Sequence, residues 1–162
     1  MAQKVIKKLK NNISLFNNLA ITKKNPVSLV HFVTNRCNAR CSFCFINFDD
    51  PLTFKGELDI DEIDKMTKNL GPNLQNVNLT GGEPFARKDF VEIAKCYFKN
   101  TDIRSIFITS NGSLPDRVEN FLKVLSEDYS DRSIMLSFSI DGLPEEHNRI
   151  RKIKNLFEST IK

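Results

Sequence analysis

One repeating pattern constrains the fold of this 162-residue chain more than any other feature. After Pro26, short β-rich runs alternate four times with polar or glycine-rich stretches and then with apolar residues at helical spacing. The runs carry the β-branched and aromatic residues typical of strands, and they cover residues 27–34, 76–80, 105–109 and 133–140. Strands joined by crossover helices favour a parallel sheet that is covered on both faces or closed as a barrel.

Apolar stripes predict the helices that follow these strands. Asp59 and Glu62 have the spacing of a capping box at the start of the first helix. The four predicted stripes consist of Ile60, Ile63, Met66 and Leu70; Phe90, Ile93, Ala94, Tyr97 and Phe98; Val118, Phe121, Leu122 and Leu125; and Ile150, Ile153, Phe157 and Ile161. Four βα units are therefore predicted, with ligand-binding residues at the carboxyl ends of the strands.

The beginning of the chain is strongly basic. Residues 1–48 hold eight Lys or Arg and no acidic residue, whereas residues 49–162 carry a net charge of −4. Such a segment occurs in nucleic-acid arms, membrane-surface helices and transit segments. Apolar residues at helical spacing, among them Ile6, Leu9 and Ile13, favour a simpler interpretation. We expect an amphipathic helix over residues 3–20 that packs on the domain, without nucleic acid as a partner.

Composition excludes several classes of protein. Leu, Ile, Val and Phe make up 51 of 162 residues, too many for an intrinsically disordered chain. No apolar stretch is long enough to span a membrane, and no secretory signal is present. Three of the four cysteines fall within eight positions, which is a poor disulfide framework. A soluble, cytoplasmic protein is predicted.

Each predicted strand is followed directly by an unusual motif. The motifs are Cys37, Cys41 and Cys44 after the first strand, Gly81-Gly82-Glu83-Pro84 after the second, Ser110-Asn111-Gly112 after the third, and Ser139, Asp141 and Gly142 at the end of the fourth. Because parallel strands end at the same edge of a sheet, we expect these motifs to lie together.

The cysteine spacing C-x3-C-x2-C allows three thiolates to converge on one small object. A structural zinc site needs four ligands, usually in two separated pairs, and a fourth ligand is not evident here. Iron–sulfur cubanes usually take four thiolates, so three would leave one iron open for chemistry. A reactive cluster is therefore predicted. The alternative is a non-catalytic interaction module held by zinc, with the basic N-terminus contacting an acidic partner.

The segment from Asn35 to Phe45 resembles the cluster loop of radical S-adenosylmethionine (SAM) enzymes. The motifs after the other three strands are similar to the GGEP motif and to the third and fourth signatures of the same family. His147-Asn148-Arg149-Ile150-Arg151 further resembles the H-D-x-x-R stretch of peptide-modifying and sulfatase-maturing branches, although Asn148 replaces the usual Asp. The resemblance covers residues 27 to about 157.

The resemblance implies a role for each motif. Cys37, Cys41 and Cys44 would hold a [4Fe-4S] cluster whose fourth iron is chelated by SAM. The SAM-contacting residues would be Phe43 for the adenine, Gly81 and Gly82 for close backbone approach, Glu83 for the methionine ammonium, Ser110, Asn111, Ser139 and Asp141 for the ribose, and Arg151 for the methionine carboxylate. The residue that contacts the substrate stays unassigned.

The function implied by the resemblance is reductive cleavage of SAM to a 5′-deoxyadenosyl radical, which abstracts hydrogen from a substrate. An electron donor such as flavodoxin or ferredoxin is then the expected partner. The His147 to Arg151 stretch favours the branch with a C-terminal auxiliary-cluster (SPASM-type) domain, and hence a peptide or protein side chain as substrate. The molybdenum-cofactor cyclase branch shares the cysteine spacing and GGEP, and is the alternative.

The chain is short for this fold. An eight-unit barrel takes about 250 residues, so the six units of a radical SAM partial barrel need about 190. Only 136 residues follow Pro26. We therefore expect an α/β chain with four of the six units, an N-terminal helix and linker over residues 1–25, and a C-terminally truncated core domain over residues 26–162. Its sheet is expected to be open, with an exposed apolar edge at the fourth strand.

Overall fold

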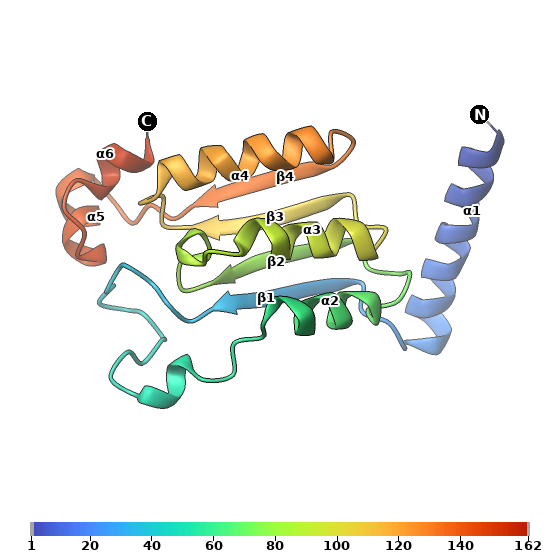
Figure 1. Cartoon of the computed structure of the whole chain (residues 1–162), viewed down its shortest axis with the longest axis horizontal. Helices are drawn as coiled ribbons and strands as arrows, with labels where there is room; N and C mark the ends of the chain where they lie inside the picture. Colours follow the sequence, from blue (N-terminus) through green and yellow to red (C-terminus); the bar gives the residue numbers. More distant parts are fainter. Residues whose placement is uncertain (1, 162) are drawn as a thin grey trace.

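A computed structural model describes residues 2–161. Within that range the chain forms one parallel sheet of four strands, in the order β1-β2-β3-β4 (Figure 1). The strands are β1 (Ser28–Thr34), β2 (Asn76–Gly81), β3 (Ser105–Ser110) and β4 (Ser133–Phe138). All four predicted strands are thus present, and their arrows end at the same side of the molecule.

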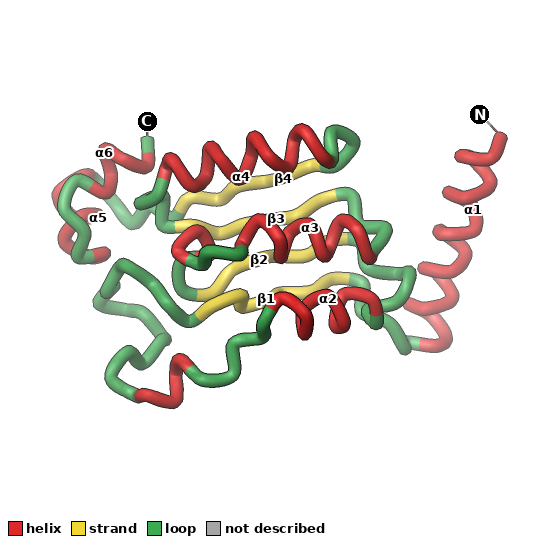
Figure 2. The backbone as a smooth tube through the Cα atoms, in the orientation of Figure 1, coloured by secondary structure: helices red, strands yellow, loops and turns green. Residues whose placement is uncertain are grey.

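Three helices cover one face of this sheet. They are α2 (Ile60–Lys68), α3 (Phe90–Asn100) and α4 (Pro115–Asp128), which lie in front of the strands in Figures 1 and 2. The capping box predicted at Asp59 and Glu62 is formed at the start of α2. Alternate strand residues such as Leu79 and Ile108 are buried against helix residues such as Phe121. Helices on one face are what a barrel wall requires, and the predicted partial (β/α) barrel is confirmed.

The other face of the sheet carries exposed apolar residues. Val30 on β1, Phe107 on β3 and Met135 on β4 share one row across the sheet and are 38–55% exposed. A closed barrel would enclose this face, which we call the concave face. Among residues 2–161, β4 pairs with β3 alone, and Phe138 at its end is 37% exposed. The predicted open sheet with an apolar fourth strand is therefore confirmed.

The N-terminal helix forms as expected but does not pack as expected. It runs as α1 (Ala2–Asn17) into one π-helical turn, η1 (Asn18–Thr22). Its apolar stripe is exposed: Ile6, Leu9, Ile13 and Phe16 are each more than half accessible, and α1 extends away from the sheet in Figure 1. The expectation of packing is wrong because α2, α3 and α4 already cover the core. No helix within residues 2–161 is long and apolar enough to cross a membrane.

The end of the chain also differs from expectation. Instead of one helix with a stripe from Ile150 to Ile161, two short helices form, α5 (Pro144–Arg151) and α6 (Leu156–Thr160). Lys152 and Asn155 between them adopt left-handed conformations, each with φ of 56°. The predicted stripe is wrong because the buried side chains are His147, Arg151 and Leu156. The described part of the chain also has two short 3-10 helices, η2 (Pro51–Phe54) and η3 (Pro84–Ala86).

Candidate functional site

The cysteine loop lies between β1 and η2, at the carboxyl edge of the sheet (Figure 1). Cys37, Cys41 and Cys44 are half-buried free thiols, and the N–H of Cys44 donates to the carbonyl of Cys41 at 3.1 Å. Burial raises the pKa of the Cys37 and Cys41 thiols above the ordinary range. Within residues 2–161, no three His, Cys, Asp or Glu side chains converge where one metal ion would bind.

The surroundings of Cys37 fit a negatively charged metal–thiolate group. The N–H of Ala39 donates to Cys37 Sγ at 3.4 Å, and the Nδ2 amide of Asn111 lies 3.8 Å from the same sulfur. Arg151 favours the thiolate of Cys41 electrostatically. N–H groups and a cation stabilise thiolate ligands and tune the potential of an iron–sulfur cluster. The donor set therefore fits the [4Fe-4S] cluster that the sequence predicts.

Gly81 and Gly82 allow the loop after β2 to touch the cysteine loop. The N–H of Gly82 donates to the carbonyl of Thr34 at 2.7 Å, and the N–H of Glu83 donates to that of Arg36 at 2.9 Å. A Cβ atom at either glycine would lie 2.2 Å from one of these carbonyl oxygens. The close approach seen in the structure is thus between two loops of the chain.

The carboxylate of Glu83 joins the loops after β2 and β3. It is fully buried, and it accepts hydrogen bonds from Ser110 Oγ at 2.9 Å, from the N–H of Asn111 at 2.8 Å and from the N–H of Phe85 at 3.1 Å. Burial raises the pKa of this carboxyl, and the three donors oppose that shift. In the structure, therefore, Glu83 is occupied by polar groups of the protein itself.

Asn111 extends the same network to the cysteines. Its Nδ2 amide donates to Asn38 Oδ1 at 3.0 Å, and Asn38 Nδ2 donates to Ser113 Oγ at 2.8 Å. No role was predicted for Asn38 or Ser113, because Asn38 occupies a variable position between two cysteines and Ser113 lies just outside its neighbouring motif. Their only signal is adjacency, Asn38 to the first cysteine and Ser113 to the Ser110-Asn111-Gly112 motif.

The fourth strand contributes two further contacts. The N–H of Ser139 donates to the carbonyl of Ser110 at 3.0 Å. Asp141 receives Arg151 Nε at 2.6 Å, and the guanidinium of Arg151 lies 6.0 Å from the ring centroid of Phe43. The predicted residues are therefore linked in two groups, one around Glu83 and Cys37 and one around Asp141 and Arg151.

Glu57 is a third residue of the site, after Asn38 and Ser113, that no sequence pattern predicted. Its Oε1 atom accepts from Thr34 Oγ1 at 2.7 Å and from the N–H of Asn35 at 3.1 Å. Its other oxygen lies 3.7 Å from Arg36 Nε. Glu57 thus fixes the start of the cysteine loop from a segment that showed no motif.

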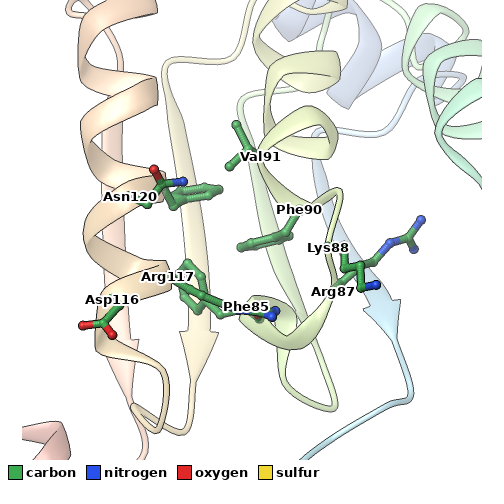
Figure 3. Close-up of a pocket in the computed structure, with 9 residues that line it drawn as sticks. Phe85, Arg87, Lys88, Phe90, Val91, Asp116, Arg117 and Asn120 are labelled. Carbon is green, nitrogen blue, oxygen red and sulfur yellow. The ribbon is translucent and has the colours of Figure 1, made fainter.

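Two hollows differ in their relation to these residues. A cavity of about 420 Å³ is lined by Cys41 and Cys44 together with Arg40 and Lys152. A groove of about 320 Å³ lies between α3 and α4 in the helical layer, with Arg117 from α4 at its side (Figure 3). None of the predicted site residues lines this groove. The hollow beside the cysteines is the one that belongs to the candidate site.

A family model described as the Radical SAM superfamily matches residues 32–162. The chain belongs to the radical SAM superfamily. Enzymes of this superfamily use a [4Fe-4S] cluster and SAM, and the fold, the recognised family and the predicted cofactors are thereby confirmed.

Known radical SAM proteins resemble the chain over different shares of its length. A GTP 3′,8-cyclase from Cronobacter sakazakii is 44% identical over 85 residues, which are 49% of this chain and 25% of the cyclase. The structure described as native anSMEcpe with bound AdoMet has a TM-score of 0.62 and 27% identity, over 84% of this chain and 39% of that one.

A second structure, Streptococcus suis SuiB bound to precursor peptide SuiA, has a TM-score of 0.63 at 18% identity. It covers 92% of this chain and 33% of SuiB. This likeness shows the fold alone. The chain spans a quarter to two fifths of the length of these relatives.

Proposed function

We propose that the chain binds a [4Fe-4S] cluster through Cys37, Cys41 and Cys44 and cleaves SAM beside it. The observation that carries this proposal is the convergence of the strand-end loops on one thiol. Asn111, held by Glu83, directs its amide at Cys37 Sγ from 3.8 Å. Together, the bound cluster and SAM supply a 5′-deoxyadenosyl radical, which abstracts hydrogen from the substrate.

The residues of the chain orient and stabilise these groups. The N–H of Ala39 and the amide of Asn111 stabilise negative charge on Cys37. We assign the methionine carboxylate of SAM to Arg151, whose guanidinium is held by Asp141. The adenine is assigned to the backbone beside Phe43, a residue that is 62% exposed.

The ribose and ammonium of SAM complete the proposed site. We assign hydroxyl contacts to four residues at the carboxyl ends of β3 and β4, namely Ser110, Asn111, Ser139 and Asp141. Glu83 sets the positions of Ser110 and Asn111, and its carboxylate is the acceptor proposed for the methionine ammonium. Gly81 and Gly82 bring the loop after β2 against the cysteine loop. The residue proposed to bind the ammonium and the residues proposed to bind the cluster therefore lie on adjacent loops.

The substrate class that we propose is a peptide or protein side chain. The anSMEcpe structure with bound AdoMet and Kp18Cys peptide is 26% identical to this chain, with a TM-score of 0.57 over 83% of it. The His147 to Arg151 stretch supports the same branch.

A second candidate substrate is GTP. The 44% identity to a GTP 3′,8-cyclase supports it, although this match covers only 85 residues. In either case we expect a small electron-transfer protein, a flavodoxin or a ferredoxin, to reduce the cluster.

Anaerobic reconstitution with iron and sulfide tests the proposed function. After reduction by dithionite, the protein is expected to show a cubane spectrum and to convert SAM into 5′-deoxyadenosine, whereas Cys41→Ala does neither. A colourless, zinc-loaded protein that leaves SAM intact would reject the proposal. Adding deuterium-labelled Kp18Cys peptide or deuterium-labelled GTP then separates the two substrate classes. The true substrate accelerates the formation of 5′-deoxyadenosine, and its deuterium appears in that product.

A further inference from the structure

The last carbonyl groups of α5 hold the cysteine loop. The N–H of Arg40 donates to the carbonyl of Arg151 at 3.3 Å, and the N–H of Ser42 donates to that of Ile150 at 3.2 Å. Carbonyl groups at the end of a helix have no partner within the helix and are free to accept from elsewhere. Arg40 and Ser42 are the two neighbours of Cys41. The segment that contains the central thiol, Cys41, is thus hydrogen-bonded to the end of α5 on both sides of that residue.

Two side chains of α5 bind one residue, Asp141. From the middle of the helix, His147 Nδ1 accepts the N–H of Asp141 at 3.2 Å. At the end of the helix, Arg151 Nε donates to Asp141 Oδ2 at 2.6 Å. Since Asp141 follows β4, this residue ties the short helix to the sheet at two points.

The side chain of His147 is suited to a fixed, neutral role. It is fully buried, and burial together with Arg151 lowers its pKa. An imidazole that accepts at Nδ1 carries its proton on Nε2. Nε2 has no hydrogen-bond partner among residues 2–161, so the acceptor at Nδ1 is the polar contact that this side chain makes there.

Contacts with α6 hold α5 from the opposite side. The rings of His147 and Phe157 meet edge to face at 5.9 Å, and the N–H of Phe157 donates to Asn148 Oδ1 at 2.8 Å. Thr160 Oγ1 donates to the carbonyl of Asn111 at 3.3 Å. The helix pair therefore touches the cysteine loop and the loop after β3, which are the two loops that meet at Cys37.

We propose that α5 is a clamp that holds the cysteine loop in its cluster-binding conformation, with His147 as the positioning residue that anchors the clamp. The proposal rests on the proposed function, because the cluster is what gives the loop its purpose. His147 acts through Asp141, the helix and the amides of Arg40 and Ser42. It needs no contact with the cluster or with SAM.

Two amide variants of His147 isolate this role. The Oδ1 atom of an asparagine side chain takes nearly the place of His Nδ1, whereas the Oε1 atom of glutamine takes nearly the place of Nε2. His147→Asn therefore keeps the acceptor for the N–H of Asp141, and His147→Gln moves it to the wrong side of the residue. Tyr97→Phe is the control, because it deletes a buried hydroxyl that bonds His31 at 2.9 Å, outside the loops of the candidate site.

The first measurement is amide hydrogen exchange on the cluster-free protein. In His147→Gln the amides of Arg40 and Ser42 are expected to exchange about tenfold faster, as follows from loss of one buried hydrogen bond. His147→Asn is expected to stay within about threefold of the unsubstituted protein, and Tyr97→Phe to leave both amides unchanged. Equal exchange in the glutamine variant and the unsubstituted protein would overturn the clamp.

The second measurement is the rate at which reconstituted protein loses iron to a chelator. His147→Gln is expected to lose its cluster about tenfold faster than the unsubstituted protein, and His147→Asn at nearly the original rate. If Tyr97→Phe loses iron as fast as His147→Gln at a matched thermal midpoint, the effect is global and the clamp is rejected. Failure of the unsubstituted protein to take up a cluster would reject the proposed function. The hydrogen-exchange experiment, which uses cluster-free protein, would still test whether α5 holds the cysteine loop.

Discussion

The carboxylate of Glu83 accepts the backbone N–H of Asn111 at 2.8 Å, across 28 residues of sequence. The same carboxylate takes the hydroxyl of Ser110, so one buried acidic side chain orders the loop after β3 from the loop after β2. Asn111 in turn contacts Asn38 and Cys37. The position of the first cysteine, which follows β1, therefore depends on Asn111 after β3 and, through it, on Glu83 after β2.

Removing this carboxylate should loosen the site and destabilise the fold. Glu83→Ala leaves a buried hydroxyl and two buried N–H groups without an acceptor and opens a cavity, so we expect a loss of about 3 kcal/mol in the free energy of unfolding. Urea denaturation measures this loss. Glu127→Ala, at an exposed position of α4, is expected to change stability by less than about 0.5 kcal/mol. Similar values for the two variants would contradict the structural role of Glu83.

The two glycines after β2 should tolerate no side chain. In Gly82→Ala the new Cβ atom would lie 2.2 Å from the carbonyl oxygen of Arg36, which forces the cysteine loop to move. We expect a loss of about 2–4 kcal/mol together with loss of iron binding.

Gly56 offers a matched control for this substitution. Its φ of 78° strains an alanine, but a Cβ atom there meets nothing within 4 Å. Gly56→Ala should therefore cost only about 1 kcal/mol and leave iron binding intact. If both alanine variants lose iron equally, the close approach of Gly82 is not what matters.

Cys41→Ala should abolish cluster binding without unfolding the protein. The reconstituted protein is expected to hold about four iron atoms per chain and the variant almost none, measured by iron analysis and visible absorbance. Cys96→Ala is the control, because Cys96 lies in α3 beside the core. Iron loss in Cys96→Ala alone would place the cluster elsewhere.

Stability should fall as the pH drops from 6.5 to 4 because of His31. Burial and Arg87 lower the pKa of His31 from 6.5 to about 4, so in this window the unfolded chain binds a proton that the folded chain does not. His31→Asn keeps an acceptor for Tyr97 and removes the titration. Between pH 6.5 and 4, the free energy of unfolding of this variant is expected to fall by about 1–2 kcal/mol less than that of the unsubstituted protein. This figure allows for solvent screening at a half-buried ring. Parallel pH profiles in urea denaturation would refute this.

The turn after α1 should matter more than the exposed face of α1. Asn18 Oδ1 accepts the N–H groups of Lys24 and Asn25 at 3.0 Å each, so Asn18→Ala is expected to cost about 2 kcal/mol. Ile13→Ser, in the exposed stripe, should change stability by less than about 0.5 kcal/mol. A large loss in Ile13→Ser, measured by thermal unfolding, would show that the helix packs on the domain in solution.

Local patterns predicted the strands, the capping box at Asp59 and the edge at which the motifs meet, because each depends on residues close in sequence. Several contacts of the candidate site could not be predicted from local patterns. Glu57, Asn38 and Ser113 act through contacts that only the tertiary structure creates, and their residue types are common in ordinary loops. His147 belongs to a motif that the sequence shows, but its contact with the N–H of Asp141 is visible only in the structure. The end of the chain was mispredicted for the same reason, since burial of His147 and Leu156 outweighs the apolar spacing of Ile150 and Ile161.

The order of the strands in the sheet is also their order in the chain, and this determines how further βα units can be added to the sheet. Each strand pairs with its successor, so a βα unit can be appended beside β4 without changing the register of β1, β2 and β3. The architecture is additive in the way of repeat proteins, where each unit relies chiefly on its immediate neighbours. Evolution can therefore lengthen such a wall at one side while the half that carries the cysteine loop stays as it is.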